Sequence, residues 1–349
     1  MKEKKRSFIF PMILLVIGLL LIILVSASVG SSSISILDSL KVIIYKIPKM
    51  NKIIDASEIN DIHYRIVYQI RLPRILLSGL VGGGLAVVGC AFQGLFRNPL
   101  ADPHILGVSS GAALGATIAM LSGLSLNVAG LGLVGLFAFI GALLTVILVY
   151  VVAGVGKNSS ISNVLLTGTA VSTLLSSIVS LLMTFNREQL EKVYMWTLGS
   201  FSGASWSKIL FLLIFVLVCC TSLIFYGKEL NVILTGEDAA LTLGINLKKV
   251  KRHIILWASL LVAACVSVSG IIGFVGLIIP HCIRLISGPN HKRLLPYSIF
   301  AGAIFMILCD TIARTIAAPS EIPVGVVTAI FGAPYFIFLL YYSQRKAKL

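Results

Sequence analysis

The feature that most constrains this chain is a succession of long apolar runs with almost no charge inside them. Ten such runs lie along the 349 residues, at about 8–25, 72–92, 105–121, 128–152, 161–183, 209–226, 254–272, 274–286, 294–312 and 324–342. A helix needs about 20 residues to cross the ~30 Å hydrocarbon core of a bilayer, and most of these runs approach that length. The pattern predicts an all-α polytopic membrane protein with about ten transmembrane helices.

Composition supports a single transmembrane domain over residues 1–349. Hydrophobic residues make up 58% of the chain and charged residues only 12%, whereas a soluble domain carries about 25% charged residues. The eighth run is short and contains Pro280. We therefore expect that helix to be tilted, broken or shielded by its neighbours.

The basic residues predict the orientation of the chain. A net charge of +15 would suit a nucleic-acid-binding protein, but these residues stand in short clusters between the apolar runs, as topology signals do. An even number of spans places both termini on one side. If that side is the cytoplasm, the inner face holds Lys2, Lys4, Lys5, Arg6, Arg97, Lys157, Lys228, Lys248, Lys249, Lys251, Arg252, Lys292, Arg293, Arg345, Lys346 and Lys348. The positive-inside rule thus predicts cytoplasmic N- and C-termini.

The N-terminal region carries two further signals. The first run resembles a signal peptide, but its length of about 18 residues exceeds the usual ~7–15, which favours a signal anchor that forms the first span. Cleavage would leave nine spans. The segment 30–69 is then an extracytoplasmic loop, in which Ser35 and Asp38 form a capping box before an amphipathic run. We expect a short helix on the outer membrane surface that covers the bundle.

Several kinds of site are missing from the sequence. It contains no G-x-x-x-x-G-K-[ST] loop, so the chain cannot itself be a P-loop ATPase. The six cysteines lie inside apolar runs without metal or redox spacing and the histidines are scattered, so we expect no metal site. Buried charges of the kind that proton-coupled carriers use are also scarce. The main exception is Asp310 with Arg314, whose i, i+4 spacing predicts that they face each other.

The fifth run carries a stripe of hydroxyl side chains on one helix face. Its members recur at offsets of three and four residues and are Thr169, Ser172, Thr173, Ser176, Ser177, Ser180 and Thr184. Small hydroxyls often serve helix packing in membranes. The alternative is the wall of a hydrated pathway, since weak uncharged contacts do not trap a cargo.

A cytoplasmic loop at 227–252 reads as two short helices broken at Gly244. Glu237 and Asp238 suit the positive N-terminal end of the first helix, and Gly244 suits its end. A plain loop with local helix explains the same residues equally well.

The elbow at residues 98–104, NPLADPH, would break any helix because of its two prolines. It joins two glycine-rich runs, and RLPR begins the first of them at Arg71. Three further motifs follow in order: NPLADP-x-x-LG, GFVGLIIPH-x-x-R from Gly273, and E-x-P-x-G-x-x-T-x-x-x-G-x-P-x-F from Glu321. With these motifs the chain resembles the FecCD-type permeases, the membrane subunits of ABC importers for iron–siderophore complexes, haem and cobalamin.

The resemblance implies a type II ABC importer permease in the bacterial cell membrane. Such a subunit acts as a homo- or heterodimer with two cytoplasmic ATPase subunits and an extracytoplasmic substrate-binding protein. ATP and Mg would be bound by the ATPase, and this chain would need no cofactor and no metal. A chelated metal arrives with its own ligands, so the permease meets only the organic surface of the cargo.

The resemblance also assigns roles to residues of this chain. Arg71, Arg74 and Arg314 would dock the binding protein, although snorkelling arginines at the membrane interface are the simpler interpretation. The segment 227–252 becomes the coupling loop, with ATPase contacts at Gly236, Glu237, Ala239, Ala240, Leu243 and Gly244. The fifth and tenth spans would line the pathway, which includes Thr169, Ser172, Thr173, Ser176 and Ser180. The cytoplasmic gate or elbow would comprise Asn98, Pro99, Leu100 and Pro103.

An iron–siderophore complex is the expected cargo, and haem or cobalamin is the alternative within the same class. A stand-alone secondary carrier or channel is the alternative from a different class. A co-purifying ATPase would favour the importer, and its absence would favour the carrier or channel.

Overall fold

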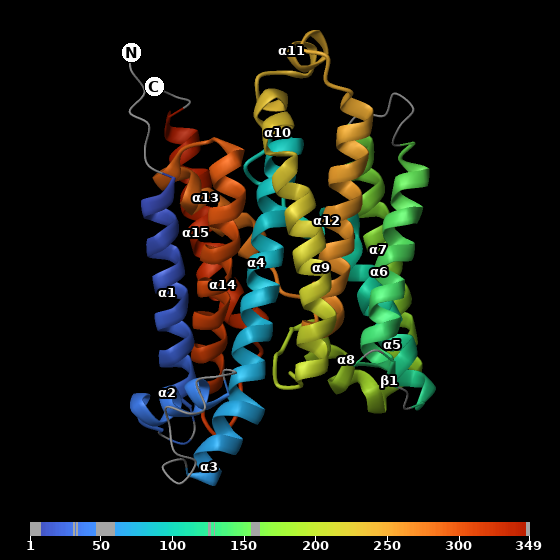
Figure 1. Cartoon of the computed structure of the whole chain (residues 1–349). Helices are drawn as coiled ribbons and strands as arrows, with labels where there is room; N and C mark the ends of the chain where they lie inside the picture. Colours follow the sequence, from blue (N-terminus) through green and yellow to red (C-terminus); the bar gives the residue numbers. More distant parts are fainter. Residues whose placement is uncertain are drawn as a thin grey trace.

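The computed structural model is a bundle of helices that run between two ends of the molecule (Figure 1). It describes residues 8–30, 32, 34–46, 60–124, 127–128, 130–154 and 161–346. Within these ranges, seven helices are long and apolar enough to cross a membrane and three are shorter, which confirms the ten predicted spans. They are α1 (Ile9–Ser28), α4 (Leu72–Leu95), α5 (Val108–Ser122), α6 (Leu133–Val152), α7 (Ile161–Phe185), α9 (Trp206–Phe225), α12 (Leu247–Ser269), α13 (Val275–Ser287), α14 (His291–Thr315) and α15 (Val324–Lys346).

Shorter elements connect the spans. At one end lie α2 (Ile36–Tyr45), α3 (Asp61–Tyr64), the π-helix η2 (Arg65–Arg71), the antiparallel pair β1 (Asn127–Val128) and β2 (Leu131–Gly132), the 3₁₀ turn η4 (Arg187–Gln189) and α8 (Leu190–Thr197). At the opposite end lie α10 (Gly227–Leu234) and α11 (Glu237–Thr242), and the 3₁₀ turn η3 (Pro103–Leu106) leads from α4 into α5.

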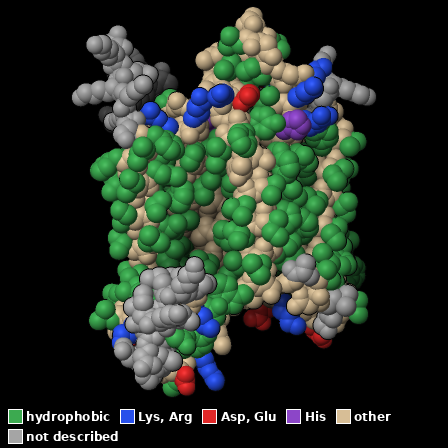
Figure 2. Space-filling view, in the orientation of Figure 1, with side chains coloured by type: hydrophobic (Ala, Val, Ile, Leu, Met, Phe, Trp, Pro, Cys, Tyr) green, Lys and Arg blue, Asp and Glu red, His purple; other side chains and the backbone are tan. Residues whose placement is uncertain are grey.

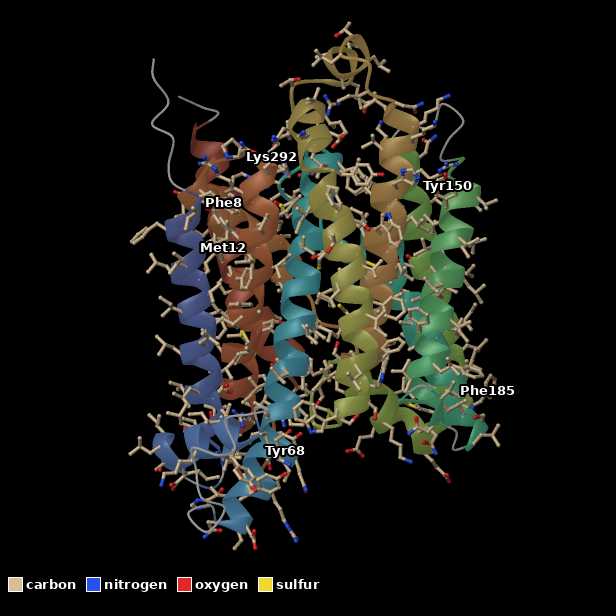
Figure 3. All side chains as sticks on the ribbon, in the orientation of Figure 1. Phe8, Met12, Tyr68, Tyr150, Phe185 and Lys292 are labelled. Carbon is tan, nitrogen blue, oxygen red and sulfur yellow. The ribbon has the colours of Figure 1, made fainter. Side chains whose placement is uncertain are left out.

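Basic side chains lie at both ends of the helix bundle, outside its apolar middle (Figure 2). The flank of the molecule is an apolar band with Lys and Arg gathered above and below it (Figure 2). Phe8 and Lys292 lie at the end that carries α11, and Tyr68 and Phe185 lie at the other (Figure 3). Of the predicted inner-face cations, Lys2, Lys4, Lys5, Arg6, Lys157 and Lys348 lie outside the described residues. We call the α11 end cytoplasmic and the α2–α8 end outer.

Several helix boundaries differ from the expected ones, and three of the differences have a clear local reason. The second span begins earlier, because α3, η2 and α4 form one continuous helix over Asp61–Leu95. The third begins later, at Val108, because Gly107 has φ +76° and ends the preceding turn. The seventh begins at Leu247, where the Asn246 side chain caps the backbone N–H of Lys249 at 3.0 Å.

Helix α4 is the centre of the bundle, and two glycine contacts let neighbouring helices reach its backbone. A Cβ added at Gly82 would lie 2.3 Å from the carbonyl oxygen of Gly302 on α14. A Cβ added at Gly89 would lie 1.8 Å from the carbonyl oxygen of Gly276 on α13. Small residues at such crossings replace the hydrophobic driving force that lipid does not supply.

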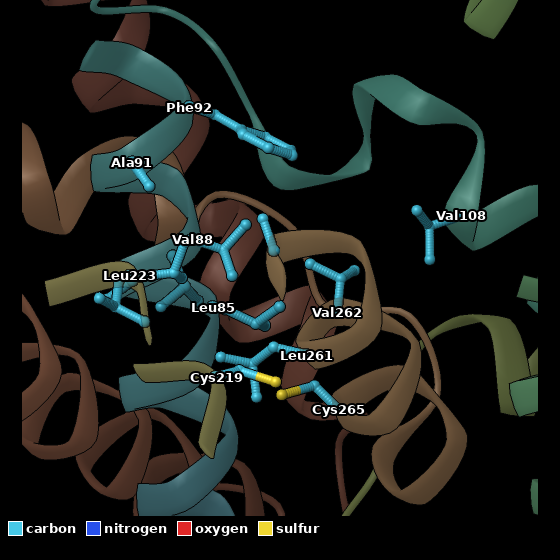
Figure 4. Close-up of a cluster of buried hydrophobic side chains, with 14 of the residues drawn as sticks. Leu85, Val88, Ala91, Phe92, Val108, Cys219, Leu223, Leu261, Val262 and Cys265 are labelled. Carbon is cyan, nitrogen blue, oxygen red and sulfur yellow. The ribbon is translucent and has the colours of Figure 1, made fainter. Parts of the chain in front are cut away.

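The interior around α4 is apolar. Leu85 and Val88 of α4 meet Leu261 and Val262 of α12 there, and the thiols of Cys219 and Cys265 lie among them (Figure 4). All six cysteines are free thiols and all but Cys282 are buried, in agreement with the expectation of apolar thiols.

The predicted surface helix is present as α2. Ser35 caps it by accepting a hydrogen bond from the backbone N–H of Asp38 at 3.0 Å. Val42 packs against the protein, whereas Ile36, Leu37 and Leu40 remain exposed at the outer end. These exposed apolar side chains suit a helix that lies on the membrane surface. Residues 47–59 of the predicted loop lie outside the described residues.

Candidate translocation pathway and coupling sites

Arg74, in the first turn of α4, holds two carboxylates at the outer end of the bundle. Its Nη2 lies 2.9 Å from Asp310 Oδ1 on α14, and its Nη1 lies 2.7 Å from Glu321 Oε1 just before α15. Arg74 is 8% exposed and Asp310 1%. This paired geometry offsets much of the cost of removing the charges from water.

Arg71 and Arg314 bind the C-terminal end of α1. Arg71 Nη1 donates to the carbonyl oxygens of Ala27 and Ser28, at 2.7 and 2.8 Å. Arg314 Nη2 donates to Ser26 Oγ at 2.7 Å and also to the Ser26 carbonyl. The last carbonyls of a helix lack donors of their own and favour a nearby cation. These two arginines therefore fasten α1 to the bundle.

Asp310 and Arg314 lie close enough to interact electrostatically, as their spacing predicts, but no hydrogen bond or salt bridge joins them directly. Both Asp310 oxygens accept hydrogen bonds from Arg74, and Arg314 turns to Ser26. The spacing of two residues on α14 could not reveal that α4 lies against it at this level. The closer and better aligned partner comes from the neighbouring helix.

The docking role of the three arginines stays a prediction, and the structure shows what it would require. Arg71, Arg74 and Arg314 are each less than 9% exposed, and each is engaged inside the chain. A carboxylate of a docking protein would have to displace an existing partner. Glu321, whose side chain is 42% exposed, is the most accessible of these partners.

The predicted coupling segment projects beyond the cytoplasmic end as α10 and α11 (Figure 1). Gly236 (φ +128°) precedes α11 and Gly244 (φ +78°) follows it, so both turns use conformations that favour glycine. The expected break at Gly244 is confirmed, but the predicted second short helix is the beginning of α12. Lys251 Nζ lies 2.8 Å from Glu237 Oε1 and holds α11 against α12.

The coupling arm, which we define as α10 with α11, presents an apolar tip. Ala240 is fully buried, while Leu241 and Leu243 are 57% and 69% exposed. Ala239, the remaining predicted contact residue, is half-buried. Two exposed leucines on a projecting helix are suited to a groove on another protein.

The hydroxyl stripe of the fifth span lies on α7 and is largely exposed, and Ser176 Oγ donates to Ser110 Oγ of α5 at 3.5 Å. Ser172, Thr173, Ser176, Ser177 and Ser180 line an open groove of about 480 Å³. Four of the hydroxyls donate to the carbonyl four residues earlier, as Ser180 does to Ser176 at 3.0 Å. Their donors are thus satisfied within the helix, and their lone pairs remain open to the groove.

The elbow runs from an exposed start to a buried end. Asn98 and Pro99 are exposed, and Asn98 Oδ1 accepts the backbone N–H of Leu100 at 2.9 Å in a tight turn. Pro103 is buried against the start of α13, since a Cβ added at Gly276 would lie 2.3 Å from its Cγ. The elbow therefore packs against the GFVGLIIPH motif that begins at Gly273. Its role as a gate stays a prediction.

Two partly buried polar contacts at the cytoplasmic end were not predicted. Arg284 Nη2 donates to Gln93 Oε1 at 2.7 Å, which ties α13 to α4. Asn231 Oδ1 on α10 accepts from the backbone N–H of His291 at 2.7 Å, which ties the coupling arm to α14. Arg284 and Glu321 stand inside the quoted motifs and could have been found there. Gln93 and Asn231 carry no signal in the sequence.

No group of three or more metal-binding side chains occurs among the described residues.

A model of the FecCD transport family matches residues 18–342 of the chain. The cobalamin import system permease BtuC of Halobacterium salinarum is 44% identical over 282 residues, which cover 81% of this chain and 75% of that protein. The hemin transport system permease HmuU of Yersinia pestis is 36% identical over 338 residues, or 95% of this chain and 97% of that protein.

The fold has a close counterpart among solved structures. An inward-facing structure of a metal-chelate type ABC transporter matches with a TM-score of 0.81 and 34% identity, covering 95% of this chain and 98% of that one. The agreement extends over nearly the whole bundle.

Proposed function

The chain belongs to the FecCD transport family, and from this premise we propose that it passes an iron–siderophore complex into the cytoplasm along α7. It is an ABC importer permease subunit of the bacterial cell membrane. ATP hydrolysis belongs to a separate subunit, and a stand-alone carrier or channel does not fit this family.

The exposed hydroxyl stripe on α7 is the observation that supports this pathway. A helix that faces lipid alone gains nothing from seven hydroxyls on one side, whereas a water-filled route between two subunits can use them. In an importer of this type the permease is dimeric. We propose that the stripes of two permease subunits face each other across the route.

We propose that the coupling arm docks on the ATPase. Leu241 and Leu243 offer an apolar contact, and the Glu237–Lys251 ion pair holds the arm in place. Two ATPase subunits, each with ATP and Mg, would bind the two arms of a dimer.

The replacement Leu243→Asp tests the docking site. We expect this variant to fold but to lose the ATPase during purification, because a carboxylate cannot enter an apolar groove without a large desolvation cost. Lys292→Asp, a charge change at the same end but off the arm, is the matched control and should co-purify normally. Normal co-purification of Leu243→Asp would contradict the assignment.

The cargo is tested by uptake into proteoliposomes that contain the permease, its ATPase and its binding protein. We expect ATP-dependent uptake of radioactive iron as a siderophore complex, and little uptake of haemin or cobalamin. The relatives described for hemin and cobalamin make those two cargoes the alternative. Uptake of either one in preference to the iron complex would replace the proposed cargo.

A further inference from the structure

A second cavity lies at the outer end, apart from the groove on α7. It has a volume of about 590 Å³, is open on one side, and is lined by the outer ends of α5, α6, α8, α9 and α12 and by the segment before α15. Small-molecule sites fall in the range of about 300–1,000 Å³. The cavity lies between the end of α7, which leads into α8, and the start of α15. These are the two helices expected to line the pathway.

Two lysines line this cavity, and neither has a carboxylate partner among the described residues. Lys208, in the first turn of α9, is half-buried, and its Nζ donates only to the carbonyl oxygen of Gly203 at 2.7 Å. Lys192 on α8 is exposed and lines the same cavity. A lysine at a span end normally extends toward the membrane surface. The Lys208 ammonium instead donates to Gly203, which also lines the cavity.

The one carboxylate in the lining does not balance these lysines. Both oxygens of Glu321 accept hydrogen bonds from Arg74 Nη1, at 2.7 and 2.9 Å. The rest of the polar lining is neutral and includes the serines Ser200, Ser202, Ser267 and Ser269. Ser200 donates its hydroxyl hydrogen to Ser202, and Ser267 and Ser269 donate theirs to helix carbonyls. The cavity thus combines two unpaired cations with several hydroxyl groups, which is the chemistry of a site for an anionic oxygen group.

We propose that this cavity binds a carboxylate or similar anionic oxygen group of the metal chelate as the chelate enters the outer end. Lys192 and Lys208 supply the charge, and the Ser202 hydroxyl, which donates to no other described residue, supplies a neutral hydrogen bond. The proposal rests on the proposed function, because it names the class of chelate that the permease favours: an anionic one. The lining also holds apolar side chains, among them Met195 and Trp196, and two lysines bind such a group weakly enough to release it.

The test uses the purified permease–ATPase complex in phosphatidylcholine nanodiscs, with ferric dicitrate as an anionic probe and ferrichrome as a neutral one. We expect ferric dicitrate to bind about tenfold more weakly to the variant Lys192→Gln/Lys208→Gln, and ferrichrome to be unaffected. Lys208→Arg should retain binding, since it keeps the charge. Lys292→Gln at the cytoplasmic start of α14, off the coupling arm, is the matched control and should behave as the wild type.

A second readout locates the site directly. Bound ferric dicitrate should protect Lys192 and Lys208, but not Lys292, from an amine-reactive reagent, as read by mass spectrometry. Unchanged affinity in the double variant, or no binding at millimolar probe, would overturn the site. Equal protection by inorganic phosphate or by phosphatidylglycerol nanodiscs would also overturn it, because the lysines would then hold phosphate or lipid rather than chelate.

The two proposals fail in different ways. Preferential uptake of cobalamin by the full transporter would remove the iron cargo while the lysine-dependent binding of ferric dicitrate still stood. The opposite result is also possible: the double variant could take up an iron–siderophore complex normally and bind ferric dicitrate with unchanged affinity. That result would rule out the anion site but leave the iron cargo in place.

Discussion

Helices α4 and α7 are nearly equal in length and opposite in their surroundings. In the helix that contains α4, 83% of the residues in its most apolar stretch are buried inside the chain. In α7 the corresponding share is 17%. α4 carries six glycines and one serine, whereas α7 carries one glycine and the hydroxyl stripe. Glycines bring neighbouring backbones into contact, while the hydroxyls line an open groove.

The difference separates two uses of small residues in a membrane. On α4 they allow close packing within one chain, so this helix determines whether the bundle folds. On α7 they leave a polar face uncovered, so this helix is available for transport or for a second subunit. A change on α4 should therefore reduce stability, and a change on α7 should reduce uptake without loss of fold.

The largest effect is expected at Gly89 on α4. In Gly89→Ala the new methyl group would overlap the backbone of Gly276, so α4 and α13 must separate at a cost of about 3 kcal/mol. Size-exclusion chromatography after detergent extraction should show mostly aggregate. Gly132→Ala, where an added Cβ meets nothing within 4 Å, should be monodisperse. Equal recovery of both variants would mean that α4 is not tightly packed.

The carboxylates around Arg74 should differ in importance. Asp310→Asn leaves a buried arginine short of its charge partner and should lower the free energy of unfolding by about 3–5 kcal/mol. Glu321→Gln removes a half-exposed partner and should cost about 1 kcal/mol or less. Thermal unfolding in detergent measures both. A larger loss for Glu321→Gln would reverse the expected order.

Ser176→Trp tests the pathway on α7. The bulky side chain enters the groove without touching the core, so uptake should stop while expression, detergent stability and ATPase binding stay normal. Leu174→Trp, on an exposed position outside the groove lining, is the control and should transport. Normal uptake by Ser176→Trp would move the pathway elsewhere.

Cysteine labelling distinguishes a water-exposed face of α7 from a face that contacts lipid. In a background without native cysteines, Thr169→Cys, Ser172→Cys, Ser176→Cys and Ser180→Cys should react at least about tenfold faster with a water-soluble thiol reagent than Leu174→Cys. Leu174 is 58% exposed in the isolated chain, so low reactivity there would reflect lipid rather than burial. Rates that change with nucleotide would tie the stripe to the transport cycle. Slow labelling along the whole stripe would make its hydroxyls packing groups.

The smallest effect is expected for Ser177→Ala. The Ser177 hydroxyl donates to the Thr173 carbonyl at 2.9 Å, and this carbonyl already belongs to the helix ladder. Its removal should change the free energy of unfolding by about 0.5 kcal/mol or less. Uptake should be nearly normal. A severe loss of stability would show that the stripe is packed against another surface.

Much of this protein was predictable because the relevant signals are local in sequence. The apolar runs, the cap at Ser35, the break at Gly244 and the hydroxyl stripe each depend on residues within a few turns of one another. The motif at Arg71 also pointed to the correct family. The partner of Asp310 was not predictable, because it depends on which helix lies beside α14.

By itself the sequence determined the membrane class, the ten spans, the orientation and the family, since a lipid environment forces every span to be a long apolar helix with its own hydrogen bonds. Only the tertiary structure decided which small residues are buried and which remain open. It buried Gly89 and left Ser176 exposed, and it paired Arg74 with Asp310 while it left Lys192 and Lys208 without carboxylate partners among the described residues. Burial and pairing depend on the neighbours that packing brings together, and no single helix carries that information.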